Sequence, residues 1–432
     1  MGKDASRRWP QPWPWFGVGL ALAFVAVRSA VALAGPAGCL GDTSVYLSQA
    51  RDPFGCHGLF LGPRPPVTAL FYAAIGADSP DAIARVPFAQ LALALPCWLW
   101  LAVAVARSLR RPAAGLVGGA LVLLVGCVPH LAMWDRVVQS DSPALSLLVA
   151  MVAAAIPLLA GERGAWRCAA LAVTGLLVTH ARVVDAFVVG GLGATLLLLG
   201  PLRRHWATAA TGFALLAIAW HGVDTNNRSG RWRFPLCNVV LQRVLSDPER
   251  TAWFAARGMP LAGDLAQRAG TWTSSDDYAI ERAAPFAAFR AWVEQDLRGT
   301  LARYVATHPG YAVLPLEDAD TVLAPEFAEL RQLPRPLAAQ RLPARWLGRL
   351  LLLATAAAIA MALWRRDRRG SVPLWLFGSG GLAWFVAWHG DAMEIARHTL
   401  SANLLLHLAI ATWIGWTVDL CLHRKPVVPG PA

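Results

Sequence analysis

Aspartate, arginine and histidine recur in short polar segments, each of which follows a long apolar run. A carboxylate beside a hydroxyl can act as a general base. The planar fork of arginine suits the oxygens of phosphate groups. These residue types therefore predict a site that removes a proton and binds an anion. They are Asp42, Arg64, Asp135, Arg136, Asp141, His180, Arg182, Asp185, His389, Asp391, Glu394, Arg397 and His398.

Each of these charges, taken alone, is also what a solvated turn between two membrane spans would contain. The set carries more weight, because an arginine accompanies a carboxylate in four separate segments and histidine joins two of them. Ionisable groups at membrane depth are costly, so they usually line a cavity and pair with one another. Whether the set forms a site depends on whether its segments share one face of the membrane.

Composition places the chain in a membrane. Of 432 residues, 56% are hydrophobic and only 15% are charged, whereas a soluble domain carries about a quarter charged residues. The net charge of +12 could suggest a nucleic-acid partner, but such proteins cluster charge with stacking aromatics on one face. Here six short segments hold 16 Lys/Arg against 3 acids, while residues 221–345 hold 15 Arg against 14 acids. This asymmetry is the positive-inside pattern of membrane topology, and no nucleic-acid partner is expected.

The apolar runs predict about ten spans, each long enough to cross roughly 30 Å of hydrocarbon. A shorter apolar run, 66–76, predicts a helix lying at the membrane interface. Arg28 lies within the first span, toward its outer end. Residues 168–202 have basic flanks at both ends, which predicts an even number of crossings there. The expected spans are 15–35, 85–106, 113–132, 143–160, two within 168–202, 206–221, 346–364, 371–388 and 401–420.

These spans give an all-α polytopic membrane protein with interfacial helices. Three parts are expected: a transmembrane module at 1–221, a mainly helical outer-face domain at 222–345, and a C-terminal transmembrane module at 346–432. In 222–345, apolar residues recur at helical spacing. Lys3, Arg7 and Arg8 precede the first span like an uncleaved signal anchor. Both termini are then cytoplasmic in the inner (plasma) membrane, and all the polar segments above share the outer face.

Two cysteines, Cys39 and Cys56, share the first outer loop, and in an oxidising compartment they could form a disulfide. No cysteine or histidine spacing typical of a metal site occurs in the chain.

The order of these segments resembles the GT-C superfamily of membrane glycosyltransferases, which use polyprenyl-phosphate-linked sugars at the outer face. The similarity begins with Asp42 in GDTSVYLSQA and Arg64 in RPPVTALFYAAIG, and continues with an acidic turn in MWDRVVQSDSPALSLL. Arg182 in THARVVDAF and Arg397 in EIARHTL complete it. The chain departs from the family in having Arg-Pro-Pro for His- or Tyr-Pro-Pro, histidine after the late arginine, and its soluble part in mid-chain.

The resemblance implies a direct displacement at the anomeric carbon of a polyprenyl-phosphate sugar, with a glycan, lipid or protein as acceptor. Asp42 would be the general base. Arg64, Arg182, Arg397 and His398 would hold the departing phosphate, since stabilising charge on a leaving group is often the largest catalytic effect. Asp135 or Asp141 would bind the acceptor, orient the partner of Asp42, or hold Mg²⁺, Mn²⁺ or Ca²⁺ through oxygen ligands.

Three other functions fit parts of the pattern. A transporter or lipid flippase would explain a basic pocket, but it predicts ionisable residues near mid-span. A non-catalytic subunit of an envelope-assembly machine would need no converging acid and base. A polymerase or ligase using lipid-diphosphate sugars would use the arginines in the same way.

Overall fold

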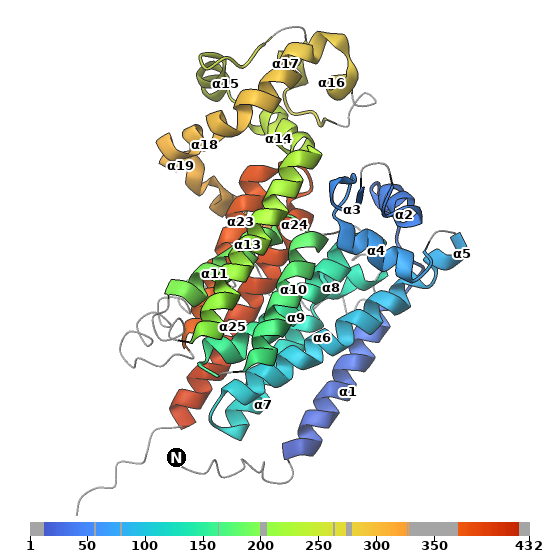
Figure 1. The fold of residues 1–432 in the computed structure, drawn as a ribbon, viewed down its shortest axis with the longest axis vertical. Helices are drawn as coiled ribbons and strands as arrows, with labels where there is room; N and C mark the ends of the chain where they lie inside the picture. Colours follow the sequence, from blue (N-terminus) through green and yellow to red (C-terminus); the bar gives the residue numbers. More distant parts are fainter. Residues whose placement is uncertain are drawn as a thin grey trace, which may run out of the picture.

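The computed structural model describes residues 13–55, 58–77, 80–162, 164–198, 205–261, 264–273, 279–325, 327 and 370–422. Within these ranges the protein is helical, and β pairing is limited to one isolated bridge between Gly38 and Val137. The elements form a bundle of long helices with shorter helices gathered at one end (Figure 1).

Among the described residues, six helices are long and apolar enough to cross a membrane. They coincide with the first, second, fourth, seventh, ninth and tenth expected spans. The expected third span is a helix pair bent by 62°, α7 (Pro112–Gly126) followed by Pro129–Arg136, which comprises α8 (Pro129–Ala132) and η1 (Met133–Arg136). The six are α1 (Trp13–Ala32), α6 (Val86–Ser108), α9 (Asp141–Leu159), α13 (Trp206–Ser229), α23 (Ser371–Gly390) and α25 (Leu400–Leu422).

The expected count of about ten spans is not confirmed. Residues 168–202 hold two short apolar helices, α10 (Ala165–Ala181, 17 residues) and α11 (Asp185–Leu198, 14 residues), whereas a perpendicular crossing needs about 20 residues. The eighth expected span, 346–364, lies outside the described residues. The described ranges therefore contain six candidate spans, or up to seven if the bent pair is one span.

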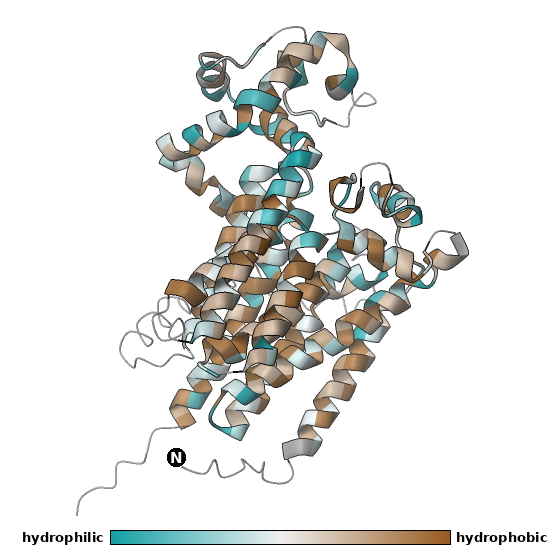
Figure 2. Cartoon of the chain, in the orientation of Figure 1, coloured by the Kyte–Doolittle hydropathy of each residue, from teal (hydrophilic) through white to brown (hydrophobic). Residues whose placement is uncertain are grey.

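The bundle is arranged around α9, which is 94% buried over its apolar window, whereas α1 is only 22% buried. Large apolar side chains such as Leu124, Phe213 and Trp220 face outward from the bundle, as lipid-facing residues do, and the middle of the bundle is hydrophobic (Figure 2). Small residues allow close packing inside it. A Cβ at Gly415 on α25 would lie 3.0 Å from the Cα of Gly118 on α7, so glycine is needed at this helix contact.

The two ends of the bundle differ. The start of α1, the α6–α7 connection and the end of α25 lie together at one end (Figure 1), and the α6–α7 connection carries Arg107, Arg110 and Arg111. The opposite end, called the outer end below, carries α2 (Thr43–Arg51), α3 (Gly58–Leu61), α4 (Pro66–Ala74) and α5 (Pro80–Ile83). Helix α4 corresponds to the interfacial helix expected at 66–76.

A second group of short helices, called the outer domain below, follows α13 at the outer end (Figure 1). The amphipathic stretch near its centre is helical as expected, and it buries Phe289, Trp292, Leu297 and Tyr304. The outer domain comprises α14 (Arg233–Val239), η2 (Val240–Val244), α15 (Pro248–Ala255), η3 (Leu265–Arg268), α16 (Ala279–Arg282), η5 (Ala284–Phe286), α17 (Ala287–Trp292), η6 (Val293–Leu297), α18 (Arg298–Thr307), α19 (Pro309–Val313), η7 (Leu314–Asp318) and α20 (Ala319–Leu323).

Candidate active site

Asp42 lies immediately before α2, in a loop that is fixed to the segment leading into α9. The amide of Gly38 donates to the carbonyl of Arg136 at 2.8 Å, and the amide of Val138 donates back to Gly38 at 2.9 Å. The hydroxyl of Thr43 donates to the carbonyl of Val138 at 2.9 Å. Although Asp42 occupies the N-cap position of α2, its side chain accepts no capping hydrogen bond. It is 28% exposed, so its carboxylate is free for other contacts.

Two arginines from distant parts of the chain contact the Asp42 carboxylate. Arg64 pairs with Oδ1, and Nη2 of Arg397 lies 3.4 Å from Oδ2. Arg64 is held in place by Gln49, which accepts from its amide at 2.9 Å and donates to its carbonyl at 3.0 Å. The ring of Tyr46 faces the Arg64 guanidinium at 5.3 Å. The first outer loop thus presents an acid and an arginine together, as the sequence indicated.

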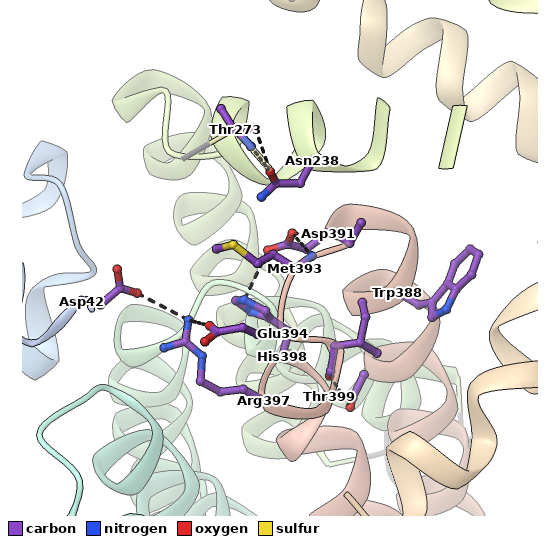
Figure 3. Close-up of polar contacts among 12 residues, drawn as sticks. Asp42, Asn238, Thr273, Trp388, Asp391, Met393, Glu394, Arg397, His398 and Thr399 are labelled. Atoms are coloured by element: carbon purple, nitrogen blue, oxygen red, sulfur yellow. Dashed lines mark hydrogen bonds and ion pairs between the residues drawn. The ribbon is translucent and has the colours of Figure 1, made fainter. Parts of the chain in front are cut away.

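Arg397 is on α24 (Ile395–His398), a short helix in the turn between α23 and α25. The turn contains Glu394, the one non-glycine with a positive φ (49°) among the described residues. Such a backbone is uncommon for glutamate and is often found at functional sites. The Arg397 guanidinium contacts the Gln139 side-chain oxygen, and its Nη2 lies 2.6 Å from Glu394 Oε2. Figure 3 shows it between Asp42 and Glu394.

Arg182 joins the same site from the end of α10. Its Nη2 donates to the carbonyl oxygen of Arg397 at 2.6 Å and lies 3.4 Å from Oδ1 of Asp141. Asp141 is the first residue of α9 and is buried. The structure therefore brings together Asp42, Arg64, Asp141, Arg182 and Arg397, which come from four separate parts of the chain.

Each of the three arginines keeps one buried N–H group without a hydrogen-bond partner among the described residues. These groups are Nε of Arg64, Nη1 of Arg182 and Nε of Arg397. A buried donor without a partner costs about 1–3 kcal/mol, more for a charged group, and native proteins leave few of them. An incoming anion could accept hydrogen bonds from these three donors.

The three guanidinium groups of the site face the carboxylates of Asp42, Asp141 and Glu394. Burial alone would lower the pKa of Arg397, but these three carboxylates outweigh it and raise that pKa above its ordinary value. No group of three metal-ligating side chains occurs among the described residues. Because each of these three carboxylates faces an arginine, the residues do not fit a divalent cation well.

His398 lies beside this cluster, but its closest contact is another acid. Its Nε2 is 3.3 Å from Oδ2 of Asp391, a buried residue at the end of α23. Burial, then Arg397, Arg182 and Arg64, hold the pKa of His398 well below its ordinary value. His398 is therefore a neutral ring at the edge of the arginine cluster.

Asp135 is placed apart from these residues. It is fully buried and paired with Arg28 of α1, whose Nε and Nη2 lie 2.7 and 3.1 Å from its oxygens, and it accepts from Ser142 at 2.7 Å. Arg28 also donates to the carbonyl of Gly126 at 2.5 Å. The pair joins α1 to the turn that precedes α9. The sequence offered Asp135 and Asp141 as alternatives for binding the acceptor or a metal. Of the two, only Asp141 lies in the arginine cluster with Asp42.

We expect Arg28→Leu to destabilise the protein by about 3–5 kcal/mol, because it leaves the Asp135 carboxylate buried and unpaired. The double variant Arg28→Leu/Asp135→Leu should recover most of this loss, since well-packed apolar residues can replace a buried ion pair. Thermal unfolding in detergent would measure both. Equal stability of the single variant and the wild type would show that the pair does not hold α1 to this turn.

The site also contains residues without an assigned role from the sequence. Gln139 anchors Arg397, and Glu394 and Asp391 orient the turn around α24. Both acids were visible in the segment HGDAMEIARHTL, whereas a glutamine gives no such signal. Cys39 is exposed and unpaired among the described residues, and Cys56 lies outside them, so their disulfide stays a prediction.

No family model and no curated protein matches the chain. Among solved structures, it is similar to the archaeal oligosaccharyltransferase AglB from Archaeoglobus fulgidus, in a complex with an inhibitory peptide and a dolichol-phosphate. The two chains are 11% identical, the TM-score is 0.45, and the match covers 92% of this chain and 50% of that one. This chain thus spans about half the length of that protein. So remote a similarity does not decide the function, which rests on the site.

Proposed function

We propose that the protein is a membrane glycosyltransferase that transfers a sugar from a polyprenyl-phosphate donor to an envelope glycan, lipid or protein acceptor. One observation carries the proposal. Arg64, Arg182 and Arg397 converge on Asp42 and Asp141 at the outer end, and each arginine keeps an unpartnered buried N–H group. Such donors fit a phosphate that arrives with the substrate.

In the proposed reaction, the donor phosphate enters among the arginines and replaces Asp42 as the partner of Arg64 and Arg397. The freed Asp42 carboxylate then takes the proton of the acceptor hydroxyl. The acceptor oxygen forms a bond to the anomeric carbon while the bond from that carbon to the phosphate oxygen breaks. Arg64, Arg182 and Arg397 stabilise the charge on the departing polyprenyl phosphate. Asp141 holds Arg182 and is the residue proposed to contact the acceptor.

A panel of polyprenyl-phosphate sugars, incubated with the purified protein in lipid nanodiscs, tests the proposal. Transfer or hydrolysis of one sugar is expected, with release of polyprenyl phosphate. Parallel reactions with lipid-diphosphate sugars distinguish a ligase or polymerase, and flux of an unmodified lipid across proteoliposomes would identify a flippase. A chelator in one set of reactions tests the divalent cation, which stays a prediction. Inertness toward every monophosphate donor would refute the proposed activity.

The proposed orientation places the outer end on the outer face of the inner (plasma) membrane and both termini in the cytoplasm. In a Cys39→Ser/Cys56→Ser background, Arg303→Cys on α18 should react in intact cells with a maleimide that does not cross membranes. Native Cys421, exposed at the end of α25, should react only after the cells are opened. The reverse labelling would place the arginine cluster in the cytoplasm.

A further inference from the structure

Asp391 is held by contacts on both sides of its carboxylate. Oδ1 accepts from the amides of Ala392 at 2.7 Å and Met393 at 2.9 Å, while Oδ2 faces Nε2 of His398 at 3.3 Å (Figure 3). The side chain is only 9% exposed. Because Oδ1 is fixed by two backbone donors, Oδ2 has one orientation relative to the histidine ring.

The outer domain places a buried polar side chain near Asp391. Asn238 of α14 is fully buried, and its side-chain oxygen accepts from the amide and hydroxyl of Thr273 at 2.9 and 2.7 Å. Its side chain lowers the pKa of Asp391 against the larger opposite effect of burial, but its amide nitrogen has no hydrogen-bond partner among the described residues. Figure 3 shows Asn238 and Thr273 on the outer-domain side of Asp391.

The proton positions follow from these surroundings. Burial raises the pKa of Asp391 to about 6, so the group is mainly a carboxylate at neutral pH. His398 is neutral, and a neutral imidazole has one N–H group and one lone pair. Nε2 is the ring nitrogen that faces Oδ2 of Asp391, at 3.3 Å. Because a carboxylate would repel a lone pair there, we infer that the proton lies on Nε2 and the lone pair on Nδ1. Among the described residues Nδ1 has no partner, and the side chain is 29% exposed.

We propose that His398 accepts, through Nδ1, a hydrogen bond from a hydroxyl of the donor sugar, and that Asp391 is the positioning residue that holds this tautomer. This inference rests on the proposed function. A nitrogen lone pair repels the oxygens of a phosphate but accepts a hydrogen bond from a hydroxyl. We therefore propose this role for His398 in place of the phosphate-binding role expected from the sequence. Because the charges of Arg397, Arg182 and Arg64 act on His398, and these arginines are proposed to hold the phosphate, we place the hydroxyl on the sugar that this phosphate carries.

Asp391→Asn tests the tautomer with little change of shape. Its side-chain oxygen can keep both backbone hydrogen bonds, so its NH₂ group faces Nε2 and forces the proton onto Nδ1. The Nδ1–H group of His398 then faces the O–H group of the substrate, so one hydrogen bond is lost and a donor is left unpaired. We expect kcat/KM to fall roughly 10–100-fold as a result. Thermal unfolding should change little. A wild-type rate for Asp391→Asn would overturn the inference.

Two substitutions of His398 separate the roles of its nitrogens. Asparagine can place an oxygen near the position of Nδ1, whereas glutamine places its end group near Nε2. His398→Asn should therefore keep most of the activity and His398→Gln should lose as much as Asp391→Asn. Adding Asp391→Asn to His398→Asn should change the rate less than about threefold, because no tautomer remains to be set. An equal loss in both backgrounds would show a merely structural role for Asp391.

Deoxy donors identify the hydroxyl. Wild-type protein should discriminate roughly 10–100-fold against the donor that lacks it, and His398→Gln should not discriminate. If the wild type transfers sugar but discriminates against no deoxy donor, the inference fails while the proposed function stands. If the wild type is inactive on every donor, both fail.

Discussion

Asp42→Asn will lower the rate of sugar transfer by about 10²–10⁴-fold, the usual contribution of a well-placed general base. Asparagine keeps the shape of the side chain but cannot take a proton from the acceptor. It also removes the negative charge that Arg64 and Arg397 contact. Donor binding should therefore be unchanged or tighter, and the loss should appear in kcat. Steady-state rates with varied donor concentration measure the two effects separately.

Asp52→Asn is the matched control, because Asp52 is exposed at the other end of the same helix, α2. It should transfer sugar at the wild-type rate. If Asp42→Asn weakened donor binding and left kcat intact, Asp42 would be a binding residue, and the base would have to be sought elsewhere.

Arg397→Lys will lower kcat by about 10²–10³-fold, as removal of one donor to a developing anion does in other enzymes. The Arg397 guanidinium contacts Gln139, Glu394 and Asp42 at once. A guanidinium has several N–H donors along its edges, so it can keep these contacts and also bind a phosphate. A lysine ammonium keeps the charge but is too compact to do both. The donor KM should rise as well, because the same group binds the ground-state phosphate.

Arg303→Lys on α18 supplies the comparison for Arg397→Lys, since Arg303 is an exposed arginine at the same end of the molecule. It should leave both kinetic constants unchanged. Full activity of Arg397→Lys would mean that only charge matters at this position. The anion would then be held by long-range attraction and not by the fork of the guanidinium.

That the polar turns gather at one end of the bundle could be predicted from sequence, because it depends on a local signal, the alternation of basic flanks; which face of the membrane this end occupies stays a prediction. The number of spans could not, because α10 and α11 are shorter than a bilayer crossing and the run at 113–132 bends between α7 and α8. Hydropathy measures length and composition, whereas a bend or a short helix depends on the neighbours against which it packs.

The candidate site shows a similar division. Asp135 and Asp141 both lie in one polar turn, and their spacing gives no reason to choose between them. In the folded chain, η1 turns Asp135 toward Arg28, while Asp141 begins α9 and faces Arg182. Gln139, between them, contacts Arg397 from 258 residues away. Such pairings arise from tertiary packing, so no local pattern in a single sequence reveals them.

The pairing of the three guanidinium groups with carboxylates has a consequence for selectivity. Because Asp42, Asp141 and Glu394 already face these groups, the empty site offers little long-range attraction to soluble anions such as inorganic phosphate, which must compete with the carboxylates for every contact. A lipid-linked phosphate has an advantage that needs no stronger contact. Its chain confines it to the bilayer surface, and this confinement raises its effective concentration at the mouth of the bundle, much as a linker raises that of a tethered ligand. The membrane itself would then select the donor.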